Sequence, residues 1–296
     1  MEQLIGTGVA LVTPFKKDLT IDRNALEALV EHCIAGGVDY LVALGTTAES
    51  VTLTPEEKRL VMQTISLANA GRLPLVLGVG GNNTKAVMDE LRTIDFMDFE
   101  AILSVSPAYN KPTQEGIYQH FKAIAKVSPL PIVLYNVPSR TGSNMLPATT
   151  IRLANDIENI VAIKEACADQ MQIDTLLTQR PEGFHIISGD DFTALSTVLA
   201  GGSGVISVLG QALPEAFSKM IDLGLRGESE PAYEIHQSLL SGMQLAFEEG
   251  NPAGVKCALS HFNIGGPEVR LPLVQASNGL SLKIKNYLND RNSVLA

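Results

Sequence analysis

A lysine that ends a short apolar segment is the residue of this sequence best suited to covalent chemistry. Lys164 follows Ile160–Ile163, whose length and β-branched residues are typical of a strand buried on both faces. Strand alternation places Ala162 and Lys164 on one face, and Val161 and Ile163 on the other. If Ala162 faces the interior of a sheet or barrel, the Lys164 amine lies at the mouth of that interior. Burial favours the neutral form of an amine, and the neutral form is the nucleophile.

Two adjacent hydroxyls follow an earlier apolar run. Thr46 and Thr47 lie in the segment Gly45-Thr-Thr-Ala-Glu-Ser50, where hydroxyl and backbone N–H groups could bind a carboxylate. A structural interpretation is open for both features: the hydroxyls could cap a helix, and Lys164 could pair with a carboxylate such as Glu165.

A phenol, a guanidinium and a second tyrosine follow two further runs. Tyr135 ends its run much as Lys164 ends the next, so neighbouring strands would place the phenol beside the amine. Arg140 offers a planar fork that suits a second carboxylate. Tyr109 lies in a stiff loop rich in Pro and Asn, residues 106–112. Together these groups are the parts of an aldolase that forms a Schiff base with a 2-oxo acid.

Eight apolar runs alternate with segments of helical periodicity, and this order predicts a (β/α)8 TIM barrel. Barrel enzymes carry their reacting groups at the C-terminal ends of the strands, where the lysine, the phenol and the hydroxyls fall. The predicted strands are Val9–Val12, Tyr40–Leu44, Leu75–Val79, Ala101–Val105, Ile132–Tyr135, Ile160–Ile163, His185–Ser188 and Gly204–Val208.

The last 70 or so residues show helical patterns only, so we predict two parts. A catalytic barrel spans residues 1–225 and a C-terminal helical subdomain spans residues 226–296. The subdomain is too small to stand alone and is expected to pack on the barrel or on another subunit. Its predicted helices are Glu230–Glu249, Pro252–Phe262 and about residues 277–290.

Composition excludes several function classes. The chain has 45% hydrophobic and 18% charged residues, as in an ordinary globular enzyme, and its net charge of −10 argues against nucleic acid and anionic membranes. Three separated cysteines favour a reducing cytoplasm, and no histidine or cysteine pattern predicts a metal site. No signal peptide or membrane span is predicted. Two Gly-rich segments, Gly78–Asn82 and Gly201–Gly204, lack the spacing and context of nucleotide-binding loops.

The sequence resembles the dihydrodipicolinate synthase and N-acetylneuraminate lyase family over essentially its whole length. The most specific matches are Gly45-Thr-Thr-Ala-Glu-Ser50, Tyr135-Asn-Val-Pro-Ser-Arg-Thr-Gly142 and Ile163-Lys-Glu-Ala166. Tyr109 and Arg140 make the chain most similar to the synthase branch. That resemblance implies condensation of pyruvate with L-aspartate 4-semialdehyde to 4-hydroxy-tetrahydrodipicolinate, in the diaminopimelate route to lysine.

The resemblance also implies a role for each matching residue. Lys164 would form an imine with pyruvate and then an enamine that adds to the aldehyde. Tyr135 would transfer protons, linked through Thr46 to Tyr109 of a neighbouring subunit, and the family commonly forms a homotetramer of two dimers. No metal or organic cofactor is implied, because the imine itself accepts the electrons. The implied substrate-binding residues are Thr47 for the pyruvate carboxylate, Arg140 for the semialdehyde carboxylate, and Gly189 and Ile206 in the pocket wall.

Two alanines depart from the family pattern. Ala48 replaces a usual glycine, so the turn must accept a β-carbon. Ala108 stands where many relatives have a second tyrosine beside Tyr109, which reduces the contact expected between the subunits of a tight dimer.

The positions that bind lysine in feedback-inhibited relatives also differ. Those relatives use two histidines and a glutamate at the dimer interface. The ammonium group of Lys58 would repel a lysine ligand, so we expect weak or absent inhibition by lysine. The matching residues in this chain are Pro55, Lys58 and Ala86, with Ser50 and Asn82 retained.

Two other functions stay open. A sister aldolase acting on N-acetylneuraminate or a 2-keto-3-deoxy sugar acid would also use the lysine, but Tyr109 and Arg140 argue against it. A non-catalytic barrel that binds a 2-oxo acid as a sensor would keep Thr47 and Arg140. Such a sensor would have no use for Lys164 beside a phenol.

Overall fold

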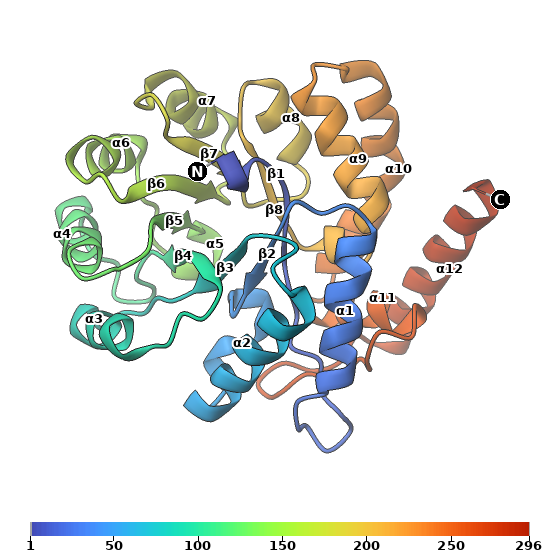
Figure 1. Ribbon diagram of the computed structural model, residues 1–296. Helices are drawn as coiled ribbons and strands as arrows, with labels where there is room; N and C mark the ends of the chain where they lie inside the picture. Colours follow the sequence, from blue (N-terminus) through green and yellow to red (C-terminus); the bar gives the residue numbers. More distant parts are fainter. Residues whose placement is uncertain (1, 296) are drawn as a thin grey trace.

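The eight apolar runs form parallel strands that pair in chain order and close into a barrel (Figure 1). In this computed structural model, which describes residues 2–295, the last strand pairs with the first and completes the ring. The predicted (β/α)8 barrel is confirmed. Its strands are β1 (Gly6–Ala10), β2 (Tyr40–Ala43), β3 (Leu75–Gly78), β4 (Phe99–Val105), β5 (Ile132–Asn136), β6 (Ile160–Glu165), β7 (His185–Ser188) and β8 (Gly204–Ser207).

The first strand lies nearer the N-terminus than the apolar run Val9–Val12 predicts. Gly6 pairs with Gly204 of β8, so β1 starts before its apolar residues. The strand ends early because the Val12 backbone N–H donates to the side chain of Gln211, at 2.9 Å, and not to a neighbouring strand.

A β-bulge corrects the predicted faces of β6. Ala162 packs inside the barrel and Ile163 packs outside it, as alternation predicts. Val161, however, packs against the interior cluster, and not on the face of Ile163. The reason is a register shift: Ile132 of β5 pairs with Ile160 and the next residue of β5 pairs with Ala162, so Val161 is the extra residue of the bulge.

Helices connect the strands and cover the outside of the barrel (Figure 1). Capping residues fix where several of them begin: the Thr54 hydroxyl accepts from Glu57 N and the Glu57 carboxylate accepts from Thr54 N. These helices are α1 (Arg23–Ala35), α2 (Pro55–Asn69), α3 (Thr84–Thr93), α4 (Gln114–Ala125), α6 (Pro147–Asp156), α7 (Gln170–Gln179), α8 (Ala194–Leu199) and α9 (Pro214–Leu225).

Several short helices lie in segments that the sequence pattern leaves as loops. The α5 helix (Pro138–Thr141) begins at a proline, whose fixed φ suits a first helical position. It ends at Gly142, where a φ of 69° lets the backbone N–H donate to Pro138 O. Four single turns of 3-10 helix are η1 (Glu2–Leu4), η2 (Thr46–Ala48), η3 (Ser50–Thr52) and η4 (Leu209–Gln211).

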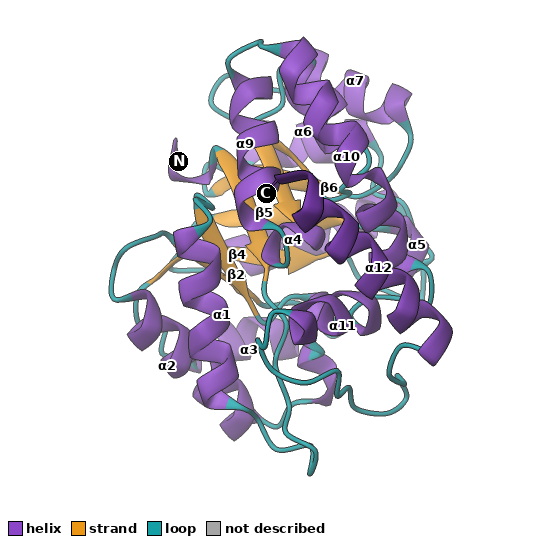
Figure 2. Cartoon of the chain, turned by 90° about the vertical axis from the view of Figure 1, so that its right-hand side faces the viewer, coloured by secondary structure: helices purple, strands orange, loops and turns teal. Residues whose placement is uncertain are grey.

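The predicted C-terminal helical appendage is present as α10 (Ser229–Phe247), α11 (Ala253–His261) and α12 (Asn278–Leu295). These helices contact one another, and α10 packs against α8 and α9 at one side of the barrel (Figures 1 and 2). The division at residues 225 and 226 stays a prediction, and its outer ends, residues 1 and 296, lie outside the described residues. Within residues 2–295, no helix is long and apolar enough to cross a membrane.

Side chains fill the barrel interior at the end where the strands begin. Tyr40, fully buried, lies across it and donates its hydroxyl to Val205 O at 3.1 Å. Gly8 makes the space, because a β-carbon there would lie 2.1 Å from the Tyr40 ring. A filled interior leaves the carboxyl ends of the strands as the place where a substrate can enter.

Candidate active site

Lys164 lies at the carboxyl end of β6, where its side chain is only 4% exposed. Its strand partner is Tyr135 of β5, and Nζ lies 4.5 Å from the centre of the Tyr135 ring. Burial lowers the pKa of Lys164 to about 8; the Asp191 carboxylate opposes this shift and the Arg140 guanidinium adds to it. An amine of that pKa is neutral in roughly one molecule in ten at pH 7, against fewer than one in about a thousand for an ordinary lysine.

Glu165 is not the ion-pair partner that a purely structural role for Lys164 would require. Its carboxylate accepts hydrogen bonds from Cys167 N at 2.7 Å, from the Asn136 amide at 2.9 Å and from the Gln172 amide at 3.0 Å. The backbone alternation of β6 directs Glu165 away from the barrel mouth while Lys164 points into it. The amine and the neighbouring carboxylate therefore serve different parts of the structure.

Asp191 is a residue near the site whose position the sequence did not reveal. The sequence suggests that Asp190 or Asp191 caps the next helix, and Asp190 does accept from backbone N–H groups just before α8. Asp191 instead is buried and accepts from Val208 N and Leu209 N after β8, the latter at 2.8 Å. Burial raises its pKa to about 6. Its carboxylate acts on the charge of Lys164 across the barrel mouth.

Tyr135 is a buried phenol with a hydrogen-bonded hydroxyl. Burial raises its pKa, whereas the Arg140 charge and a hydrogen bond with the Thr46 side chain lower it. The direction set by burial keeps the hydroxyl protonated at neutral pH, so it can donate a proton. The structure thus brings the amine, the phenol and the first hydroxyl of the Thr46 segment into one contiguous group.

Thr47, the next residue, is held by the C-terminal part of the chain. Its buried hydroxyl accepts a hydrogen bond of 2.8 Å from the Asn251 side-chain amide, in the turn before α11. Ala48 fits without strain, because the left-handed position of this turn belongs to Glu49, with a φ of 54°. Asn251 follows a glycine and precedes a proline, which by itself reads as a turn; nothing local identifies it as a neighbour of Thr47.

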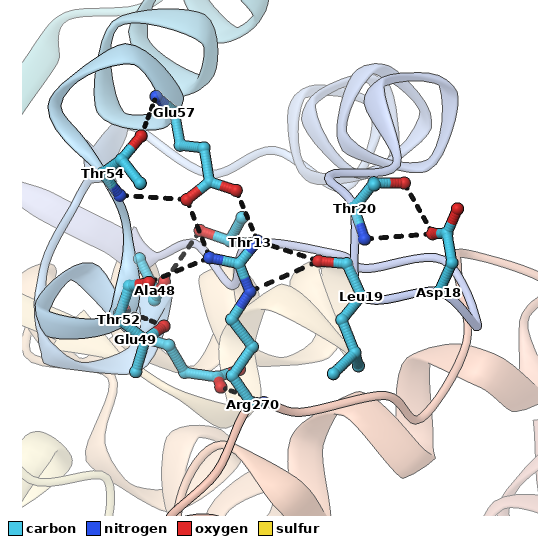
Figure 3. A network of polar contacts seen from close by, with 10 residues as sticks. All are labelled: Thr13, Asp18, Leu19, Thr20, Ala48, Glu49, Thr52, Thr54, Glu57 and Arg270. Carbon is cyan, nitrogen blue, oxygen red and sulfur yellow. Dashed lines mark hydrogen bonds and ion pairs between the residues drawn. The ribbon is translucent and has the colours of Figure 1, made fainter.

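An ion pair with both side chains 1% exposed holds the other end of this turn. Glu49 accepts from Lys256 Nζ of α11 at 2.5 Å and from Arg270 N at 2.8 Å. Figure 3 shows the Arg270 side chain continuing the network to Glu57 and to Leu19 O. The segment that follows β2 is therefore fixed by residues more than 200 positions later in the chain.

The remaining substrate-binding candidates lie around the lysine. Arg140, on α5, is exposed at the rim and acts electrostatically on both Lys164 and Tyr135. Gly189 lies against the lysine stem: a β-carbon there would be 3.0 Å from Cγ and Cε of Lys164. Ile206 of β8 is buried in the interior cluster.

Tyr109 stands apart from this group within one chain. Its side chain is 90% exposed on the loop after β4, and its backbone N–H donates to Thr141 O at 3.0 Å. The Asn82 amide fixes the same loop through two hydrogen bonds of 2.8 Å to the backbone of Ala108. The family resemblance implies that Tyr109 reaches the site of a neighbouring subunit, so that expectation concerns a contact between chains and stays a prediction.

A cavity of about 170 Å³ adjoins the candidate site. Thr46 and Tyr135 of the candidate site line it, together with Ser50, Lys58 and Glu90. In the described part of the chain, no group of three or more His, Cys, Asp or Glu side chains is placed to hold a metal ion.

Comparison with known proteins gives consistent matches. A model of the Dihydrodipicolinate synthetase family matches residues 3–291. The chain is 56% identical over 284 residues to a Flavobacterium psychrophilum protein named 4-hydroxy-tetrahydrodipicolinate synthase, covering 96% of this chain and 97% of that protein.

Two solved structures share 37% identity with this chain and cover 98% of it. One, from Acinetobacter baumannii, is described as a chloride-inhibited dihydrodipicolinate synthase complexed with pyruvate; its TM-score is 0.94 and 99% of its chain is covered. The other is described as the first monomeric dihydrodipicolinate synthase variant; its TM-score is 0.95 and 97% of its chain is covered.

Proposed function

The chain belongs to the Dihydrodipicolinate synthetase family and is an enzyme of the lyase class, and we propose that it condenses pyruvate with L-aspartate 4-semialdehyde. The product is 4-hydroxy-tetrahydrodipicolinate, in the diaminopimelate route to lysine. The observation that carries the proposal is the buried Lys164 amine in register with Tyr135. The names of the relatives support the same reaction.

Lys164 acts as the nucleophile in the proposed mechanism. Its neutral amine attacks C2 of pyruvate, and loss of water gives a protonated imine. Loss of a proton from the pyruvate methyl group then gives an enamine, whose carbon adds to the aldehyde carbon of the second substrate. The amine of that substrate next attacks the imine carbon, which closes the ring and releases Lys164. The imine accepts the electrons, so these reaction steps require no cofactor.

Tyr135 moves the protons in these steps. Its hydroxyl is hydrogen-bonded with Thr46 and its ring lies beside the Lys164 amine, so the phenol can protonate the departing hydroxyl and later the aldehyde oxygen. Thr47 binds the pyruvate carboxylate and Arg140 binds the semialdehyde carboxylate. Gly189 and Ile206 form the pocket wall beside the lysine stem.

Assembly is part of the proposal, because Tyr109 has no catalytic contact within one chain. In a homotetramer of two dimers, the exposed Tyr109 of one subunit reaches Thr46 of its neighbour and extends the proton path to solvent. One similar solved structure is described as a monomeric variant. We further propose a cytoplasmic location, in line with the free cysteines Cys33, Cys167 and Cys257.

Turnover in three separate reactions tests the proposed function. We expect the purified enzyme to consume pyruvate and L-aspartate 4-semialdehyde together, with a kcat/KM at least about a hundredfold above that for cleavage of N-acetylneuraminate or a 2-keto-3-deoxy sugar acid. Mass spectrometry of the products gives the readout. Faster release of pyruvate from a sugar acid would assign the chain to a sister aldolase. Pyruvate binding without any turnover would favour the sensor.

Lysine is expected to inhibit weakly or not at all. Lys58 lines the same cavity as Ser50 and Thr46, and its ammonium repels the ammonium groups of a lysine ligand. Pro55 and Ala86 supply no ligand groups, and the Asn82 amide is occupied by the loop backbone. The measurement is initial rate against lysine concentration, with Lys58→Gln as the matched variant that removes the repulsion. Half-inhibition of the unaltered enzyme at sub-millimolar lysine would contradict this expectation.

A further inference from the structure

The contact between Asn251 and Thr47 joins two segments 204 residues apart at the barrel mouth. Both side chains are buried, and the amide Nδ2 donates to the hydroxyl Oγ1 at 2.8 Å. A hydroxyl has one proton to donate and two lone pairs to accept with. Because the amide N–H occupies a lone pair of Thr47, the hydroxyl proton stays available for another acceptor.

The direction of this hydrogen bond matters for a carboxylate ligand. An ionised carboxylate accepts hydrogen bonds and donates none. A Thr47 hydroxyl that donated to a protein group would turn its lone pairs toward the ligand and repel it. The amide of Asn251 prevents this orientation by acting as the donor.

We propose that Asn251 is a positioning residue that fixes the Thr47 hydroxyl as a hydrogen-bond donor to the carboxylate of the 2-oxo acid substrate. The inference deepens the proposed function and rests on its assignment of Thr47 to the pyruvate carboxylate. It gives the C-terminal helical part of the chain a role in substrate binding that acts through Thr47.

The other end of the Asn251 amide supports this role. Among the described residues, the buried Oδ1 has no hydrogen-bond partner. A buried amide with a purely structural role is expected to satisfy both of its polar atoms. Asn251 instead leaves its acceptor unused and keeps only the donor contact with Thr47.

A second interaction, an ion pair, fixes the turn that contains Thr47 relative to Asn251. Two residues after Thr47, the buried Glu49 carboxylate pairs with Lys256, five residues after Asn251. Arg270 N donates to the second Glu49 oxygen, and the Arg270 side chain anchors to Glu57 (Figure 3). The turn and the segment that carries Asn251 thus form one rigid unit, which a hydroxyl of fixed direction requires.

Asn251→Asp and Asn251→Ala separate this role from packing. In Asn251→Asp, the carboxylate accepts a hydrogen bond from the Thr47 hydroxyl, which can then no longer donate to the substrate. In Asn251→Ala, the Thr47 hydroxyl loses its partner and is only free to rotate. The readout is the pyruvate concentration that half-saturates borohydride trapping of the Lys164 adduct. We expect it to rise about 50-fold in Asn251→Asp and only about threefold in Asn251→Ala, because a lost donor to a charged group costs more than a loosened one.

Two controls complete the test. Asn263→Asp makes the same chemical change at an exposed position of the C-terminal part and should leave half-saturation unchanged. Thr47→Val should abolish the difference between the two Asn251 variants. Circular dichroism and thermal unfolding check that each variant is folded, and Asn251→Ala introduces no buried charge.

The outcomes distinguish this inference from the proposed function. If the unaltered enzyme forms no pyruvate adduct, the proposed function fails. If the adduct forms but Asn251→Asp and Asn251→Ala shift half-saturation equally, or not at all, the inference is wrong and the proposed function stands. A difference that persists in the Thr47→Val background also overturns it, because the effect then does not pass through Thr47.

Discussion

Lys164→Ala is expected to lose the covalent pyruvate adduct completely and to lower kcat/KM by a factor of about a thousand or more. In the proposed mechanism the Lys164 amine nitrogen is the atom that joins to the substrate. Its pKa of about 8 results mainly from burial at the end of β6. Lys164→Arg should fail as well, because a guanidinium stays protonated and cannot attack a carbonyl.

Borohydride reduction with pyruvate, followed by intact and peptide mass measurement, checks this result. Lys256 is an internal control: burial lowers its pKa to about 8 as well, but it is held in a buried ion pair with Glu49. We expect the adduct on Lys164 and none on Lys256. That result would show that a lowered lysine pKa is not sufficient for adduct formation with pyruvate.

The pH dependence of trapping follows from the direction of the Lys164 shift. The pKa of Lys164 is about 8, so at lower pH the amine is protonated and unreactive. The rate of adduct formation should therefore rise with pH and level off above about pH 8. A rate that kept rising toward pH 10 would mean that the lysine titrates as an ordinary exposed one. An adduct on any other lysine, or turnover retained in Lys164→Ala, would contradict the proposed mechanism.

Tyr135→Phe is expected to lower kcat by a factor of about a hundred to a thousand, within the usual range for a lost general acid–base group. The substitution keeps the ring over which Lys164 Nζ lies, so the packing at the end of β5 is unchanged. It removes only the hydroxyl and its hydrogen bond with Thr46. Pyruvate should therefore still bind, while the proton transfers become slow.

Exchange of the pyruvate methyl protons with deuterated water isolates the step concerned. The enamine forms by losing one of these protons, and NMR follows their replacement without the second substrate. We expect slow exchange in Tyr135→Phe, and a smaller effect in Thr46→Val, which removes the hydrogen-bond partner but keeps the phenol. If kcat and exchange in Tyr135→Phe stayed within about threefold of the unaltered enzyme, Tyr135 would not be the proton-transfer group.

The sequence alone determined the barrel and the neighbourhood of Lys164. Repeated apolar runs with helices between them leave few arrangements, and in a barrel each strand pairs with the next. Since Tyr135 and Lys164 end consecutive strands, their contact follows from local pattern and chain order. The family resemblance, carried by short motifs at these strand ends, is confirmed by the family match and the relatives.

Only the tertiary structure decided which distant residues support that site. The bulge at Val161 arises from the register between two strands, and the buried Asp191 owes its position to the loop after β8. Asn251 and Lys256 reach the turn after β2 because α11 packs there, more than 200 residues along the chain. Residue type and local spacing predict strands, helices and caps, since those depend on neighbours in sequence. Contacts between segments far apart depend on how the completed elements pack, and no local pattern carries that information.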